Sequence, residues 1–274
     1  MGEPIPCAVA DRLLMLQIVA LLVLAAALAR PAAAANVEWW ESYLAGATAI
    51  LGAPSESDWR VNVGAGVGMA PDYPGSTEYE GVPLPLIDIE WKGSYFLSTQ
   101  RGLGAVLSRT RQFRAGARLT YDRGRESGQN SRLTGLRDIE PSIEGGAFLE
   151  FYRANWRFAG DIRKGISDGH QGIVISGSAA VGGRFSDTTS LILGGEAHYA
   201  DSTYMDAYFG SGSFVAQSGA RDVGGFMNFV YMLTPQAYLT LDSRVSLLLG
   251  DAAGSPLSTD DVQYFLGSVV GYRF

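Results

Sequence analysis

Few residues in this 274-residue chain have side chains suited to catalysis. It contains two histidines, His170 and His198, and a single cysteine, Cys7. His198 is closely followed by Asp201 and Ser202, so the residue types that serine hydrolases use as base, orienting acid and nucleophile occur together here. The first chemistry to consider is therefore ester hydrolysis.

The residue pattern around His198 argues against that chemistry. Leu193 and Tyr199 belong to an apolar row that alternates with a row containing Glu196 and His198, as in a strand with two different faces. A histidine that faces inward cannot readily attack a lipid ester on the outside. We expect His198 to join a polar network near Glu196, and His170 to lie in a solvated turn.

Metal, nucleotide and nucleic-acid chemistry are equally poorly supported. The histidines are far apart, and the acidic residues do not follow the spacing of a calcium loop. Gly64, Gly66 and Gly68 resemble part of a nucleotide loop, but the required helix does not follow, so an inward strand face explains them better. The net charge of −7 disfavours nucleic acid. We expect no catalytic residue, no cofactor and no metal.

The last residues of the chain alternate strictly between two rows. One row is mainly apolar and ends on an aromatic residue: Val262, Tyr264, Leu266, Ser268, Val270, Tyr272 and Phe274. This pattern is typical of the closing strand of a bacterial outer-membrane β-barrel, with one face toward lipid and one toward a polar lumen. Tyr272 and Phe274 are the expected assembly signal.

The same alternation recurs along the chain at intervals of about twenty residues, which suits spans of about ten residues plus connections. In 138–152 and 155–163, which we expect to form a hairpin, acidic and basic inner rows face each other. Residues 83–107 are interpreted as three short strands, broken at Lys92-Gly93 and at Gln100-Arg101. Further strands are expected at 58–69, 113–122, 172–185, 190–199, 222–233, 237–248 and 261–274. The pattern predicts an all-β fold, a transmembrane antiparallel barrel of about twelve strands over 58–274, with ten to fourteen compatible.

The amino-terminal residues predict export. Residues 13–29 form an apolar run, followed by Ala32 to Ala35, which is the pattern of a secretory signal peptide over 1–35. A single membrane anchor is the competing interpretation. Residues 36–57, with Trp39, Trp40 and Tyr43, are expected to be a periplasmic extension, a plug or an interfacial segment. Cys7 would leave with the signal.

Four longer connections are expected outside the cell, and the short turns in the periplasm. These connections are 70–82, 123–137, 200–221 and 249–260, all rich in Gly, Ser, Asp and Arg.

Five blocks in order along the chain resemble the MipA/OmpV family of outer-membrane proteins. They are PDYPGSTEY at 71–79 with VPLP at 82–85, LTGLRDI at 133–139, TYMDAYFG at 203–210, GDAAGSP at 250–256 and GYRF at 271–274. The resemblance implies a barrel in the outer membrane of a Gram-negative envelope. It also implies a non-enzymatic scaffold that links a lytic transglycosylase, which cleaves murein, to a penicillin-binding protein, which synthesises it. Other members are described as adhesins or as osmotically regulated outer-membrane proteins.

The resemblance brings no catalytic residue, so the candidate site is a partner surface. Its expected members are aromatic: Trp39, Trp40, Tyr43, Tyr73, Tyr79, Tyr204 and Tyr208. The segment from Tyr204 to Phe209 either plugs the barrel mouth or contacts a partner. Expected partners are outer-membrane lipid, the barrel assembly machinery and the two murein enzymes. The alternatives are a small-solute pore, or an adhesin that uses loops 123–137 and 200–221.

Overall fold

A computed structural model describes residues 58–274 of the chain. The predictions for the signal peptide over 1–35 and for the segment 36–57, including Trp39, Trp40 and Tyr43, fall outside the described residues.

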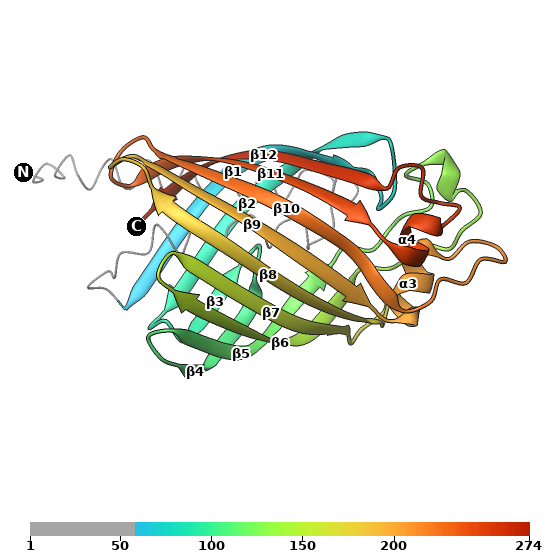
Figure 1. Cartoon of the computed structure of the whole chain (residues 1–274), viewed down its shortest axis with the longest axis horizontal. Helices are drawn as coiled ribbons and strands as arrows, with labels where there is room; N and C mark the ends of the chain where they lie inside the picture. Colours follow the sequence, from blue (N-terminus) through green and yellow to red (C-terminus); the bar gives the residue numbers. More distant parts are fainter. Residues whose placement is uncertain (1–57) are drawn as a thin grey trace, which may run out of the picture.

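Twelve antiparallel strands close into a barrel in which every strand pairs with its neighbours in sequence, and β1 pairs with β12 (Figure 1). The predicted fold and strand number are confirmed. The strands are β1 (Trp59–Pro71), β2 (Tyr79–Trp91), β3 (Tyr95–Ser98), β4 (Gly102–Arg109), β5 (Phe113–Asp122), β6 (Ser142–Arg153), β7 (Trp156–Gly165), β8 (Ile173–Arg184), β9 (Thr189–Ala200), β10 (Gly219–Met232), β11 (Ala237–Leu248) and β12 (Val262–Arg273).

The predicted breaks between the short strands are turns. Lys92 and Gly93 both have positive φ angles, 52° and 62°, which is the backbone conformation of the tight hairpin turn that suits the twist of paired strands. The amide of Ser94 closes this turn on the carbonyl of Trp91 at 3.0 Å. β2 begins at Tyr79, earlier than expected, because its ladder with β1 extends to the pair Pro71 and Tyr79.

The two rows of each strand face different environments. Outward side chains are apolar and exposed, as Val67, Leu193 and Leu266 illustrate, whereas inward residues such as Thr120 are buried. Two inward glycines of β1, Gly64 and Gly66, lie so close to β12 that an added Cβ would collide with its carbonyls. The alternation therefore builds a wall with an apolar outer surface and a polar interior, as the bilayer requires.

Aromatic side chains gather on the outer surface at the end where the turns are short. Trp59 and Trp91 have ring centroids 5.9 Å apart, and Tyr272 and Phe274 have centroids 4.8 Å apart. Such a girdle marks the membrane interface, here at the periplasmic end. Phe274 is half-exposed, and its amide donates to the carbonyl of Val61 at 2.9 Å.

At the opposite, extracellular end, the long loops carry the short helical elements η1 (Ser131–Leu133), α3 (Ser202–Phe209) and α4 (Gly250–Gly254) (Figure 1). Within residues 58–274, no helix combines the length and apolar character needed to cross a bilayer. The expected strand 138–152 begins too early in the chain. Because β6 begins only at Ser142, Ile139 belongs to a loop that folds back, pairs with Arg125 and becomes buried.

Candidate functional site: a charged lumen under a packed cap

Ion pairs line the inner wall where β6 and β7 meet. Glu150 accepts a hydrogen bond from Arg157 at 2.6 Å, and the carboxylate of Glu144 lies 3.4 Å from Arg163. The predicted pairing of an acidic inner row with a basic one is therefore confirmed. The strand register produces it, because inward residues on adjacent strands stand opposite or diagonal to one another.

The pairing continues around this side of the lumen. Arg101 contacts Asp88 at 2.7 Å, Arg118 contacts Asp161 at 3.0 Å, and Arg114 lies 3.6 Å from Glu150. Buried ion pairs add little net stability, because desolvation offsets their attraction, but removing one partner costs about 3 to 5 kcal/mol. These charges are thus held in fixed positions by their partners.

A second charged cluster lies on β9, β10 and β11. The Nδ1 atom of His198 is 2.9 Å from the Oδ1 atom of Asp222, and Arg244 lies 3.1 Å from the same oxygen. Arg221 contacts the other carboxylate oxygen, Oδ2, at 2.6 Å. Glu196, the expected neighbour of His198, instead pairs with Arg244. The predicted polar network near Glu196 is confirmed: the register sets His198 opposite Asp222, and Arg244 links Asp222 to Glu196.

A serine hydrolase would need a nucleophile bonded to His198. Ser202 begins α3, and Asp201 caps that helix by accepting from the amide of Tyr204 at 2.9 Å, so neither serves His198. Ser176 stands opposite His198 in the β8–β9 ladder, but its buried hydroxyl has no hydrogen-bond partner among residues 58–274. The described residues therefore lack the bond between nucleophile and base that activates a serine.

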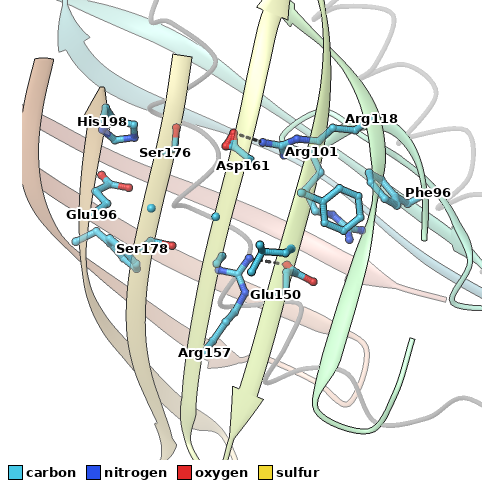
Figure 2. A pocket seen from close by; sticks show the side chains of 16 residues that line it. Phe96, Arg101, Arg118, Glu150, Arg157, Asp161, Ser176, Ser178, Glu196 and His198 are labelled. Atoms are coloured by element: carbon cyan, nitrogen blue, oxygen red, sulfur yellow. Dashed lines mark hydrogen bonds and ion pairs between the residues drawn. The ribbon is translucent and has the colours of Figure 1, made fainter. Parts of the chain in front are cut away.

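A small cavity separates the two charged clusters (Figure 2). Its volume is about 80 Å³, which is room for a few water molecules. Arg118, Glu150 and Arg157 lie on one side, and Ser178 and Glu196 on the other. Among residues 58–274 no cluster of three metal-binding side chains is present. The arrangement can hold small polar molecules, but it offers no evident reaction centre.

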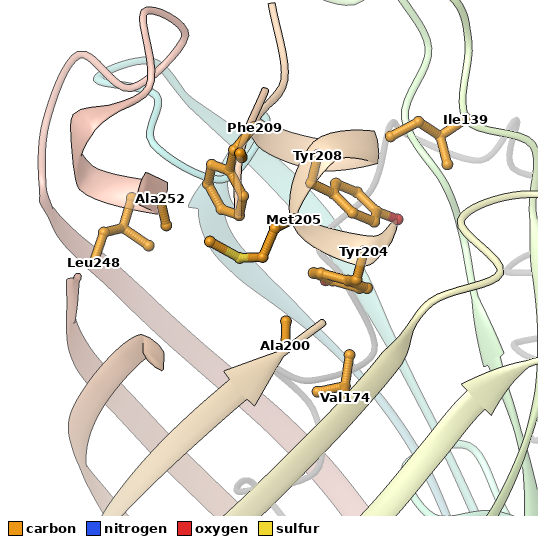
Figure 3. Close-up of a cluster of buried hydrophobic side chains, with 10 residues drawn as sticks. Ile139, Val174, Ala200, Tyr204, Met205, Tyr208, Phe209, Leu248 and Ala252 are labelled. Carbon is orange, nitrogen blue, oxygen red and sulfur yellow. The ribbon is translucent and has the colours of Figure 1, made fainter. Parts of the chain in front are cut away.

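The extracellular mouth is covered by the loops 72–78, 123–141, 201–218 and 249–261, here called the cap. Its centre is an apolar cluster around α3, in which Tyr204, Met205, Tyr208 and Phe209 are buried (Figure 3). Hydrogen bonds fix this cluster to the barrel: the Tyr208 hydroxyl donates to Asp122 at 2.5 Å.

Tyr204 and Tyr208 are thus not an exposed partner surface, which corrects that expectation. Of the two interpretations of this segment, plugging the mouth fits the packing. The cause is that each aromatic ring packs inward while its hydroxyl finds an internal partner: Tyr204 accepts from Arg221 at 3.1 Å.

Tyr73 is also buried, against expectation. Its hydroxyl donates to the carbonyl of Leu257 at 3.1 Å, and burial raises its pKa above the ordinary tyrosine value. Asp72, beside it, accepts from the Asn130 side chain at 2.7 Å. Tyr79 is partly exposed and its hydroxyl accepts from the amide of Tyr264 at 3.2 Å. The first loop is therefore bonded to two other loops of the cap, 123–141 and 249–261.

His170 was expected to be solvated and is buried instead. Its Nε2 atom lies 3.3 Å from Glu144, its Nδ1 atom accepts from the amide of Gly172 at 3.1 Å, and its ring packs edge-on against Tyr204. Sequence reasoning missed this role because the glycines around His170 suggest only a turn. It also missed the roles of Asp122, Arg221 and Asp222 in these polar networks. The signal available for them was a charged residue near the end of a strand, in the row that faces inward.

A closed twelve-stranded wall, an apolar outer surface, an aromatic girdle and a charged interior define the molecule as a β-barrel of the outer membrane. A family model described as MltA-interacting protein MipA matches residues 63–274, so the chain belongs to the MipA family.

Solved structures with a similar trace are outer-membrane proteins of low sequence identity. An outer-membrane channel from Pseudomonas putida F1 is 11% identical, with 80% of this chain and 97% of that chain covered and a TM-score of 0.43. OmpF of Salmonella typhi is 8% identical, with 79% and 97% covered and a TM-score of 0.39. Neisserial surface protein A is 12% identical, with 80% and 98% covered and a TM-score of 0.26. No curated protein matches the chain.

Proposed function

We propose that this barrel is a non-enzymatic scaffold of the cell envelope, which holds a murein hydrolase of the MltA type near a murein synthase. The observation that carries the proposal is membership of a family described by its interaction with MltA. The proposed partners further include outer-membrane lipid and, during insertion, the barrel assembly machinery.

The site geometry supports a scaffold over the two alternatives that involve the lumen. The cap packs over the mouth with buried aromatic side chains, and the lumen charges are engaged in ion pairs, which disfavours a solute pore. Ser176 has no bond to His198, which disfavours a hydrolase. A surface adhesin would use the exposed parts of the cap.

The periplasmic end offers a surface for such a partner. Its turns and strand ends carry exposed cations, here called the basic rim: Lys92, Arg109, Arg111, Arg153 and Arg184. Asp58 and Asp187 are exposed acids at the same end. A mainly cationic rim on a chain of net charge −7 favours an acidic partner surface and would speed its association. Trp39, Trp40 and Tyr43 remain proposed contributors.

Binding of the purified full chain to an MltA-type lytic transglycosylase and to a penicillin-binding protein tests the scaffold. Replacing two cations of the basic rim, Arg111→Glu with Arg153→Glu, should weaken binding roughly twofold to thirtyfold. This range follows from a loss of about 0.2 to 1 kcal/mol for each of the two exposed ion pairs. The loss should shrink at high salt. The matched control reverses two exposed cations of the cap, Arg132→Glu with Arg137→Glu, and should bind normally.

His198→Ala completes the test, because it should leave binding intact. Absence of binding together with single-channel conductance across a bilayer would replace the scaffold with a pore. Release of fatty acid that His198→Ala abolishes in a folded barrel would replace it with a hydrolase.

A further inference from the structure

The hairpin of β3 and β4 is short and does not extend to the extracellular end of the barrel wall. β3 has four residues, and its ladder with β2 ends at the pair Asp88 and Ser98. On the other side, the ladder of β4 with β5 ends at Leu103 and Leu119. Beyond these pairs, the extracellular part of β2 and the last three residues of β5 have no strand of this hairpin beside them.

The open edge of β2 carries prolines where a neighbouring strand would accept hydrogen bonds. The Thr99 amide donates to the Ile87 carbonyl at 2.8 Å, and the Thr99 hydroxyl accepts from the Ile87 amide at 3.2 Å. Both backbone groups of Ile87 therefore point to the open edge. Backbone groups of alternate residues point to the same side of a strand, so Pro83 and Pro85 point to this edge as well. Proline has no N–H, and the Pro85 carbonyl accepts from the Thr99 hydroxyl at 3.0 Å.

These features make the edge suitable for lipid and unsuitable for another strand. Unsatisfied backbone donors are costly in a bilayer, and the prolines remove two of them. The same prolines block strand addition, because the ladder hydrogen bonds have no donor there. The VPLP motif thus marks an edge that stays open.

A groove of about 380 Å³ occupies the open segment of the wall, a volume within the range of small-molecule sites. Its sides are formed by outward apolar residues, among them Leu97, Leu103, Leu119 and Ile143. At its floor, the Ser98 and Thr120 hydroxyls donate to Gln100 at 2.9 Å and to Glu144 at 2.8 Å. Both hydroxyls thus bond to polar partners of the barrel interior.

A cation stands at the extracellular end of the groove. Arg123 lines it directly after the end of β5, and partial burial lowers the pKa of its guanidinium. Arg123 thus places a positive charge at the extracellular end of the apolar surface.

We propose that this groove binds one acyl chain of a phosphate-bearing lipid of the outer leaflet, with the lipid phosphate near Arg123. The apolar walls select the chain, the cation selects the anionic headgroup, and the proline edge excludes a polypeptide strand. This lipid site is independent of the scaffold and would exist whether or not murein enzymes bind.

Native mass spectrometry of the folded full chain tests the site, after exchange from mixed micelles of dimyristoyl phosphatidylglycerol into a mild detergent. The wild type should retain one phosphatidylglycerol. Leu103→Trp fills the groove and should abolish retention, while Leu193→Trp, at an equally outward position on the continuous wall, should preserve it. Arg123→Gln should lower retention about fivefold, and Arg137→Gln, in the cap, should not.

Heat-modifiable migration establishes that each variant is folded. A wild type that retains no lipid would overturn the proposal, and so would equal retention by folded Leu103→Trp and Leu193→Trp. Equal retention by the two arginine variants would contradict the phosphate contact. Capture of a polypeptide in place of lipid would show that the edge pairs with a strand.

Discussion

At the residue scale, the described chain stabilises its charged and aromatic side chains through partners that lie far away in sequence. Asp122 ends β5, and its carboxylate accepts from Tyr208 of α3 and from the amide of Gly124 at 2.7 Å. Arg125 donates to the carbonyl of Tyr208 at 2.7 Å, so two residues beside β5 position one turn of the cap. A hydroxyl that binds a buried carboxylate is costly to remove, because the carboxylate then loses a donor.

Tyr208→Phe should therefore lower the free energy of unfolding by about 1 to 3 kcal/mol. Denaturant titration of the barrel folded in phospholipid vesicles measures this loss. Tyr199→Phe is the matched control, since Tyr199 is outward and half-exposed, and should change stability little. Equal losses in the two variants would mean that the bond from Tyr208 to Asp122 does not hold the cap.

At the element scale, alternation was enough to predict the strands. Outward residues contact the bilayer and inward residues face the lumen, so the alternation of odd and even positions along a strand is enough to assign residues such as Leu119 and Thr120 to their faces. This alternation cannot predict which loops meet. The contacts of Tyr73 with Leu257 and of His198 with Asp222 depend on register and on loop packing across up to 184 residues. Burial of His170 and Ile139 depends on the same long-range packing.

The outward row of β11 provides a test at this scale. Leu241 lies near the middle of the strand and Leu247 near its extracellular end, and both are about equally exposed. Leu241→Arg should cost about 2 to 4 kcal/mol of folding free energy in vesicles, while Leu247→Arg should cost about 0 to 1 kcal/mol, because an arginine near the interface reaches water. Equal costs would contradict the assignment of β11 to the full depth of the membrane.

At the scale of the whole molecule, one closed barrel positions three regions with different chemistry. The capped extracellular mouth, the ion-paired lumen and the periplasmic basic rim are positioned by the same twelve strands, and the open segment at β3 and β4 interrupts only the lipid face. Closure itself depends on the ladder between β1 and β12, which runs from Met69 and Leu266 to Asn62 and Arg273. Phe274 lies just beyond that ladder.

Phe274 allows membrane assembly to be separated from stability. Its amide bonds to Val61 whatever the side chain, and its half-exposed ring packs edge-on against Tyr272. Phe274→Asp should therefore refold in vesicles almost as well as the wild type, yet reach the outer membrane of cells in reduced amounts if the aromatic ring is the assembly signal. Heat-modifiable migration measures both outcomes, and Phe274→Tyr is the matched control that keeps an aromatic ring. Normal amounts of folded Phe274→Asp in cells would disprove the assembly role, whereas failure to refold in vesicles would assign the ring to barrel stability.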